Sequence, residues 1–214
     1  MLRKALLICG ILTSLLYVAM NVFVPMQWPA YNSFSQTVSE LSAIGAPTRS
    51  LWVPLGLLYA ILFIAFGWGV MRSAGQKRKL HIVGILLIID GVISLAWPYA
   101  PMHLRETLAS GGATLSDTIH LIFAMVTVLV MVLAIGFGAV SFGKGFLIYS
   151  IISLIVLLLF GILTSMDASK VDKNLPTPWI GVWERINIGV FLFWVIVLAT
   201  VLLRSEKLPD KVKN

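Results

Sequence analysis

Eight side chains of a mostly apolar chain could bind a ligand or take part in chemistry. They are Ser39, Glu40, Arg49, His103, Asp117, His120, Glu184 and Arg185. An imidazole or a carboxyl group can act as a general acid or base, and a serine hydroxyl can act as a nucleophile. Guanidinium groups form charge-assisted hydrogen bonds to phosphate and carboxylate. These residue types therefore suit either an anion-binding pocket or a hydrolytic centre.

A hydrolytic centre would depend on His120, Glu40 and Ser39. His120 would be a general base or metal ligand, Glu40 or Glu184 a general acid or ligand, and Ser39 a nucleophile. If a metal were bound, His103, His120 and Asp117 would be its ligands, but their spacing matches no metal signature. The chain also lacks H-E-x-x-H, G-x-S-x-G and phosphate-loop motifs. We therefore assign no metal, and both the cofactor and the question of enzyme activity stay open.

The elements that position these residues follow from composition. The chain has 214 residues, of which 59% are hydrophobic and 12% charged, whereas soluble domains average about 25% charged. Its mean hydropathy is +0.96. Runs of about 20 apolar residues are long enough to cross a bilayer as helices. Six such runs predict an all-α membrane bundle in one domain, residues 1–214, with spans at about 5–25, 51–74, 80–99, 118–141, 146–166 and 178–204.

The distribution of basic residues predicts the orientation, because lysine and arginine concentrate in cytoplasmic loops. With both termini in the cytoplasm, eleven of the sixteen lysine and arginine residues lie on that side. These eleven are Arg3, Lys4, Arg72, Lys77, Arg78, Lys79, Lys144, Arg204, Lys207, Lys211 and Lys213. The prediction is a multi-pass protein of the cell membrane. The net charge of +7 then needs no nucleic acid partner, and membrane lipids are the expected partners. The oligomeric state stays open.

The first outer loop contains an unusually polar tract, YNSFSQTVSELSAIGAPTRSLW. Ser33 begins an S-x-x-Q capping box, and Gly45 followed by proline is a helix stop. The tract therefore predicts a short extra helix over about 34–44. This helix either tucks into the mouth of the bundle or lies on the surface with Glu40 facing water.

The tract LSDTIHLIFA opens the fourth span. Ser116 or Asp117 is placed to cap this helix, and a carboxylate in the first turn suits the helix dipole. His120 lies about one turn inside the span among apolar residues. Because a buried imidazole needs a polar partner, His120 is the stronger functional candidate.

The tract NLPTPWIGVWERINIG opens the sixth span. Thr177 as N-cap and Pro178 at the first helical position predict where this helix begins. Glu184 and Arg185 then point about 100° apart, so neither pairs with the other simply by being adjacent. Partners open to Arg185 are Glu40, Asp117 or a ligand, and those open to Glu184 are Arg49, Arg105 or His120. Alternatively, both side chains reach the outer headgroups.

Asp90 lies near the middle of the third span, where an ionised carboxylate is costly. Two interpretations are open. Asp90 is protonated and hydrogen-bonded to a group such as Ser94, Asn21 or Tyr149, or it belongs to a proton or cation path.

The segments SQTVSELSAIGAPTRSLW, DTIHLIFAM and GVWERINIGVFLFWVIVLA resemble the prokaryotic membrane proteins grouped as domain of unknown function 998. The matching pieces are Ser39-Glu40-Leu41, Gly45-Ala46-Pro47, His120 with Ala124, and Glu184-Arg185. This resemblance implies six spans but no activity. A looser similarity extends to the six-span Frag1/DRAM/Sfk1 group, although the acidic residue and the glycine are spaced differently here. That group is associated with membrane lipids.

The leading functional expectation is an outward-facing polar pocket that recognises a lipid or another amphiphile. Ser39, Glu40, His120, Glu184 and Arg185 would line it, and Arg49 and Arg185 would bind the anionic head. The alternatives are an intramembrane hydrolase or transferase that acts on lipid, and a small transporter that uses Asp90 as its proton-linked group.

Overall fold

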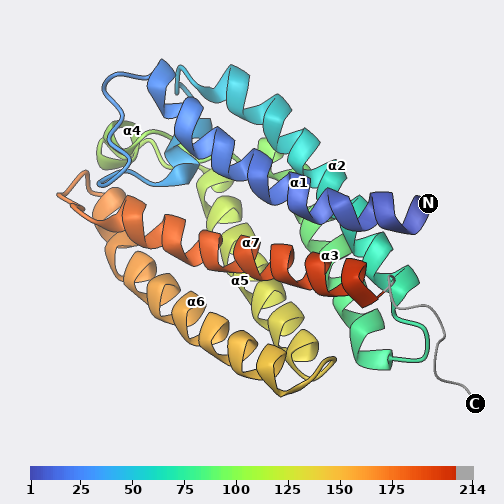
Figure 1. The fold of residues 1–214 in the computed structure, drawn as a ribbon. Coiled ribbons are helices and arrows are strands. Elements are labelled where there is room, and N and C mark those ends of the chain that lie inside the picture. Colours follow the sequence, from blue (N-terminus) through green and yellow to red (C-terminus); the bar gives the residue numbers. More distant parts are fainter. Residues whose placement is uncertain (206–214) are drawn as a thin grey trace, which may run out of the picture.

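The computed structural model describes residues 1–205, and it is built from helices (Figure 1). Within these residues, six helices are long and apolar enough to cross a membrane. They are α1 (Leu2–Phe23), α2 (Arg49–Ser73), α3 (Arg78–Ala96), α5 (Leu115–Ala139), α6 (Lys144–Val171) and α7 (Ile180–Ser205). The predicted all-α, six-span membrane protein is therefore confirmed. Lys207, Lys211 and Lys213, which entered the charge count, lie outside the described residues.

The long helices form a closed ring in which each packs against two others. In ring order they are α1, α2, α3, α5, α6 and α7, and α7 packs back against α1. Sequence neighbours are thus also neighbours in space, as the short turns at residues 74–77 and 140–143 require. Large aromatic side chains fill the ring: Phe63 lies 6.1 Å from Phe191, and Phe191 stacks on Trp194, centroid to centroid 6.2 Å. The bundle is a packed core rather than an open channel.

Helices α2 and α3 approach closely because glycines lie at their interface. A methyl group on Gly84 would sit 2.7 Å from the Met71 amide nitrogen and 2.9 Å from the Gly67 carbonyl oxygen. Small residues allow membrane helices to approach each other in this way. The close packing of α2 against α3 therefore requires residues without a side chain at positions 67 and 84.

We expect Gly84→Ala to destabilise the protein by about 1–3 kcal/mol, the usual cost of overpacking a tight interface. The thermal unfolding midpoint in lipid nanodiscs measures this effect. Gly136→Ala is the matched control, because Gly136 is a helical glycine with no heavy atom within 4 Å of an added methyl group. Equal midpoints for the two variants would contradict the tight α2–α3 contact.

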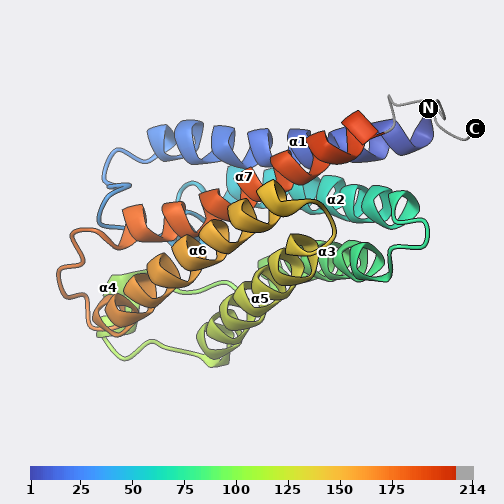
Figure 2. The same cartoon turned by 60° about the horizontal axis from the view of Figure 1, so that its bottom comes forward.

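All the long connections lie at one end of the bundle, where they form a cap (Figure 2). We define the cap as residues 24–48, 97–114 and 172–179. It contains four short helices: η1 (Pro25–Gln27), η2 (Val38–Ser42), η3 (Trp97–Tyr99) and α4 (Arg105–Ala109). The N-terminus and the last turn of α7 lie at the opposite end.

The cap segments are joined to one another by backbone and apolar contacts. The Ile44 amide donates to the Met102 carbonyl oxygen at 2.8 Å, within a parallel bridge between Ile44 and His103. A small apolar core lies beneath, formed by Ala43, Ala46, Met102, Leu108, Val171 and Ile180. The cap is therefore a folded layer with its own core.

Candidate functional site

The polar tract of the first cap segment forms a shorter helix than predicted. Instead of a helix over 34–44, only η2 (Val38–Ser42) is helical, and its N-cap is Thr37. The capping box joins Thr37 to Glu40, not Ser33 to the glutamine three residues later. The reason is local: the Asn32 side chain accepts from the Phe34 amide at 2.9 Å and holds the preceding residues in a turn.

Glu40 is fully buried, with 0% of its surface exposed, and it pairs with Arg105. Arg105 Nη2 lies 2.6 Å from Glu40 Oε1, and Nε lies 2.9 Å from Oε2, so the ion pair is bidentate. Burial alone would lower the pKa of Arg105, but the hydrogen bonds and charge of Glu40 outweigh it and raise the pKa. The surface-helix interpretation, with Glu40 facing water, was therefore wrong.

The same guanidinium reaches the two other cap segments. Arg105 Nη2 donates to the Ser35 carbonyl oxygen at 3.2 Å, and Nη1 donates to Thr177 Oγ1 at 3.3 Å. The Thr177 hydroxyl in turn donates to the same Ser35 oxygen at 2.8 Å. Thr177 thus ties the α6–α7 connection to the first segment, and α7 begins at Ile180 rather than at Pro178 as predicted.

Arg185 supports the first cap segment from below. Its Nη1 donates to the carbonyl oxygens of Ser33 at 2.9 Å and Gln36 at 3.2 Å, and its Nη2 donates to the Tyr31 hydroxyl at 2.7 Å. Burial raises the pKa of Tyr31, although the Arg185 charge opposes this shift. Arg185 therefore holds the first cap segment in place through these hydrogen bonds. The prediction that Arg185 pairs with Glu40 or Asp117 was wrong.

Glu184 binds the same segment through the backbone. Its Oε2 accepts a hydrogen bond from the amide of Val38, the first residue of η2. Gly181, one turn earlier, lies directly against the carbonyl oxygens of Ser33 and Gln36, where a side chain would not fit. The predicted Glu184 partners Arg49, Arg105 and His120 were wrong, as was the interpretation that both charges reach the headgroups.

His103 and Asp117 form a second pair in the cap. His103 Nδ1 lies 2.9 Å from Asp117 Oδ2, and the His103 amide donates to Oδ1 at 2.7 Å. Helix α5 is capped by Thr114, with Asp117 completing its capping box, so neither Ser116 nor Asp117 is the N-cap. The Ser116 hydroxyl donates to the Pro101 carbonyl oxygen at 2.7 Å.

His120 is held apart from that pair. It is 6% exposed, its Nδ1 donates to the Ala100 carbonyl oxygen at 2.9 Å, and its ring lies edge-on to Trp97 at 4.7 Å. Over residues 1–205, no group of three or more His, Cys, Asp and Glu is arranged to hold a metal ion. The ligand set of His103, His120 and Asp117 is therefore not assembled in this structure.

Asp90 is 1% exposed, and its Oδ1 has no hydrogen-bond partner among the described residues. None of the three predicted partners forms a hydrogen bond with the Asp90 carboxyl group. The Ser94 hydroxyl donates to the Asp90 backbone oxygen at 2.9 Å, and Asn21 Nδ2 donates to the Tyr17 carbonyl oxygen. The Tyr149 hydroxyl is itself buried without a partner. The prediction that one of these groups satisfies the carboxyl was wrong.

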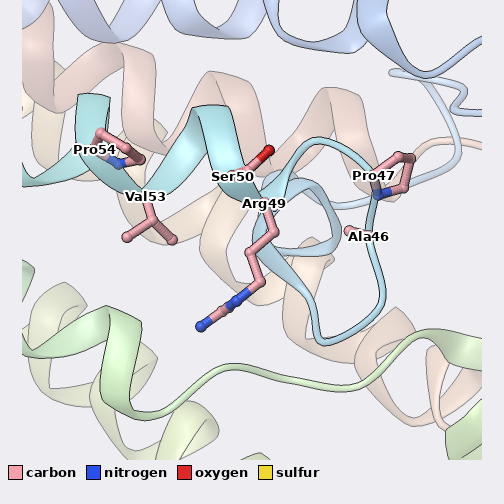
Figure 3. Close-up of a pocket in the computed structure, with 6 residues that line it drawn as sticks. All are labelled: Ala46, Pro47, Arg49, Ser50, Val53 and Pro54. Carbon is pink, nitrogen blue, oxygen red and sulfur yellow. The ribbon is translucent and has the colours of Figure 1, made fainter.

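Arg49 lies beside an open depression at the start of α2 (Figure 3). The depression has a volume of about 530 Å³, and its lining residues are Ala46, Pro47, Arg49, Ser50, Val53 and Pro54. A smaller hollow of about 40 Å³ shares Arg49 and Val53 with the depression and is also lined by Ser94 and Trp97. Arg49 donates to the carbonyl oxygens of Ser42 and Pro98, the latter at 3.1 Å. Its side chain points from α2 toward the segment that follows α3.

The eight predicted residues therefore do not form one pocket. Glu40, Glu184 and Arg185 hold the first cap segment, in which the Ser39 carbonyl oxygen accepts from the Ser42 hydroxyl at 3.1 Å. His103, Asp117 and His120 hold the second segment, and Arg49 lies at a separate hollow. Sequence reasoning missed Arg105, Tyr31 and Thr177 as members of the cap network. One signal existed for Arg105: a basic residue is uncommon in a loop predicted to lie outside, so a carboxylate partner could have been expected.

Comparison with protein families places residues 11–201 within the family described as "Protein of unknown function (DUF998)". The chain belongs to this family. In the comparisons with curated proteins and with solved structures, nothing matched. No finding bears on the looser similarity to the Frag1/DRAM/Sfk1 group, so no lipid chemistry is transferred from it.

Proposed function

We propose that this protein binds an amphiphile with an anionic head, a phospholipid being the simplest, at the Arg49 depression. The observation that carries the proposal is the position of Arg49. Arg49 lines both hollows, and in the described part of the chain its guanidinium contacts backbone carbonyl oxygens and forms no ion pair. By contrast, Arg105 is neutralised by Glu40, and Lys170 pairs with Asp167 at 2.6 Å.

Arg49 keeps donors for a ligand. A guanidinium has five N–H groups, of which the Ser42 and Pro98 carbonyl oxygens engage two. The remaining donors suit two oxygens of a phosphate, because the planar fork matches phosphate geometry. The two carbonyl contacts also hold the guanidinium in place, which lowers the entropic cost of binding.

The lining beyond Arg49 suits an acyl chain. Val53 lies one turn further along α2, and Pro54, Gly56 and Trp97 add apolar surface. The depression opens at the end of a membrane span, where headgroups and acyl chains meet. The charged head would therefore be bound at Arg49 and the acyl chain along Val53, and these two residues line both hollows.

We place the cap on the outer face of the cell membrane and both termini in the cytoplasm. This orientation is supported by the basic residues at the end of the bundle away from the cap, because lysine and arginine concentrate on the cytoplasmic side. They are Arg3, Lys4, Arg72, Lys77, Arg78, Lys79, Lys144 and Arg204. The lipid would then belong to the outer leaflet. We do not favour a lipid hydrolase, because the carboxylate of Glu40 is held by Arg105 and His120 is bonded to Ala100.

The proposal predicts that Arg49→Ala weakens retention of phosphatidylglycerol. Loss of charge-assisted hydrogen bonds costs about 1.5–3 kcal/mol, which corresponds to a roughly tenfold or greater loss of affinity. Native mass spectrometry of protein in mixed phosphatidylglycerol and phosphatidylcholine micelles measures the retained lipid. Arg49→Lys should retain an intermediate amount, since the ammonium keeps the charge but loses the fork.

Arg72→Ala is the matched control, because Arg72 is an exposed arginine at the other end of the same helix. It should bind phosphatidylglycerol like the wild type. If Arg49→Ala and Arg72→Ala retained the same amount as the wild type, the proposed site would be wrong.

A further inference from the structure

The buried carboxyl of Asp90 is not used by the proposed lipid site. It lies on α3, which packs between α2 and α5. A carboxyl group in a membrane segment without a partner is costly whether ionised or neutral, so such groups are rare unless they have a function.

Toward the cap, ionisable and polar groups follow one another. Tyr59 on α2 is buried, and α2 lies against α3 at this level, since a methyl group on Gly91 would sit 3.2 Å from the Ala60 carbonyl oxygen. The Tyr59 ring lies 5.3 Å from that of Tyr17 on α1. Asn21 Nδ2 donates to the Tyr17 carbonyl oxygen at 3.0 Å, its Oδ1 is buried without a partner, and Tyr17 also interacts electrostatically with Glu184 on α7. Three helices of the ring thus contribute to one line of polar groups between Asp90 and the cap.

Toward the opposite end, the buried side chains of α2 and α3 are apolar. On α3 the buried residues before Asp90 are Leu80, Val83, Gly84 and Leu87. On α2 the buried residues after Tyr59 and Ala60 are Phe63, Phe66, Gly67, Gly69 and Val70. The α2 and α3 side of the core below Asp90 is therefore aromatic and aliphatic, and the buried hydroxyls of Thr13 and Ser14 on α1 are bonded to backbone carbonyl oxygens.

The remaining titratable groups near this line lie on α5, α6 and α7 and in the cap. Helix α5, which also packs against α3, carries Asp117 and His120, and both lie at its cap end in contact with His103 and Ala100. Around Glu184 the neighbouring charges are Arg185 and Glu40, with Tyr31 at the edge, and Glu40 is neutralised by Arg105. On α6, Asp167 pairs with Lys170, and Tyr149 lies among the core aromatic residues.

We propose that Asp90 is a proton-binding site that exchanges with the cap side through Tyr59, Tyr17 and Glu184. The carboxylic acid of Asp90 gives up its proton, each hydroxyl accepts one proton and releases its own to the next group, and bridging water molecules close the gaps. In the net reaction, the neutral Asp90 carboxyl becomes a carboxylate, and one water molecule on the cap side becomes a hydronium ion. The inference is independent of lipid binding at Arg49.

The test is an infrared pH titration of the reconstituted protein combined with a pH jump. We expect a protonated-carboxyl band that vanishes as the pH rises, shifts on isotope labelling of aspartate carboxyl groups, and is missing in Asp90→Asn. In a pH jump, Tyr59→Phe and Tyr17→Phe should slow the loss of this band at least about tenfold, equivalent to about 1.4 kcal/mol on the barrier.

Tyr149→Phe is the matched control, because its hydroxyl is also buried without a partner but lies off the proposed path. Its exchange rate should equal that of the wild type. A titrating band that persists in Asp90→Asn would overturn the proton site. Unchanged rates in both Tyr59→Phe and Tyr17→Phe would overturn the path, and these variants retain Asp90 if Asp90→Asn fails to fold.

Discussion

Arg105→Met is expected to destabilise the cap strongly, because Arg105 is the buried partner of Glu40. It leaves the fully buried Glu40 carboxylate without its ion pair and removes the donors to Ser35 and Thr177. Removing one partner of a buried pair costs about 3–5 kcal/mol, which for a chain of this length lowers the unfolding midpoint by roughly 10 °C. Thermal unfolding in lipid nanodiscs measures the shift.

Two further variants isolate the ion pair from other effects. Glu40→Gln should be destabilised to a similar extent, because it leaves Arg105 as the unpaired buried charge. Glu106→Gln is the control, since Glu106 follows Arg105 directly but is exposed, and it should melt like the wild type. If Arg105→Met and Glu106→Gln had equal midpoints, the pair would not hold the cap.

Arg185→Met is expected to release the first cap segment while leaving the rest of the bundle closed. It removes the donors that hold the Ser33 and Gln36 carbonyl oxygens and the Tyr31 hydroxyl. Hydrogen bonds from a charged group contribute about 1.5–3 kcal/mol each, so opening of this segment should become at least tenfold more frequent.

Hydrogen exchange followed by mass spectrometry measures that opening. Amides of residues 31–44 should exchange at least about tenfold faster in Arg185→Met, whereas peptides from α3 should not change. Lys173→Met is the control, because it removes an exposed cap charge. Unchanged exchange of residues 31–44 in Arg185→Met would show that another group supports this segment.

The six spans could be predicted from the sequence because each exceeds the length that hydrocarbon requires, and no alternative satisfies the backbone there. The ring order followed in part from the two short turns. The first residue of each helix was harder to predict. Thr114 rather than Asp117 caps α5, and α7 begins at Ile180 rather than Pro178, since several residues in each tract could serve as caps.

The candidate site was predictable as a set of residues but not as a set of partners. Glu40, Glu184 and Arg185 do lie in one region, because all three belong to the cap end. Their partners include backbone groups of residues 33–38, the Tyr31 hydroxyl, and Arg105, which is 65 positions from Glu40. Periodicity along single helices carries no information on such contacts between loops, so the cap network could not be derived.

The most direct test of the proposed function is an experimental structure of the protein in lipid that contains phosphatidylglycerol. We predict density for one headgroup within hydrogen-bond distance of the Arg49 guanidinium, with an acyl chain along Val53 and Gly56. A structure in which Arg49 contacts only the Ser42 and Pro98 carbonyl oxygens and the depression holds no lipid would contradict the account.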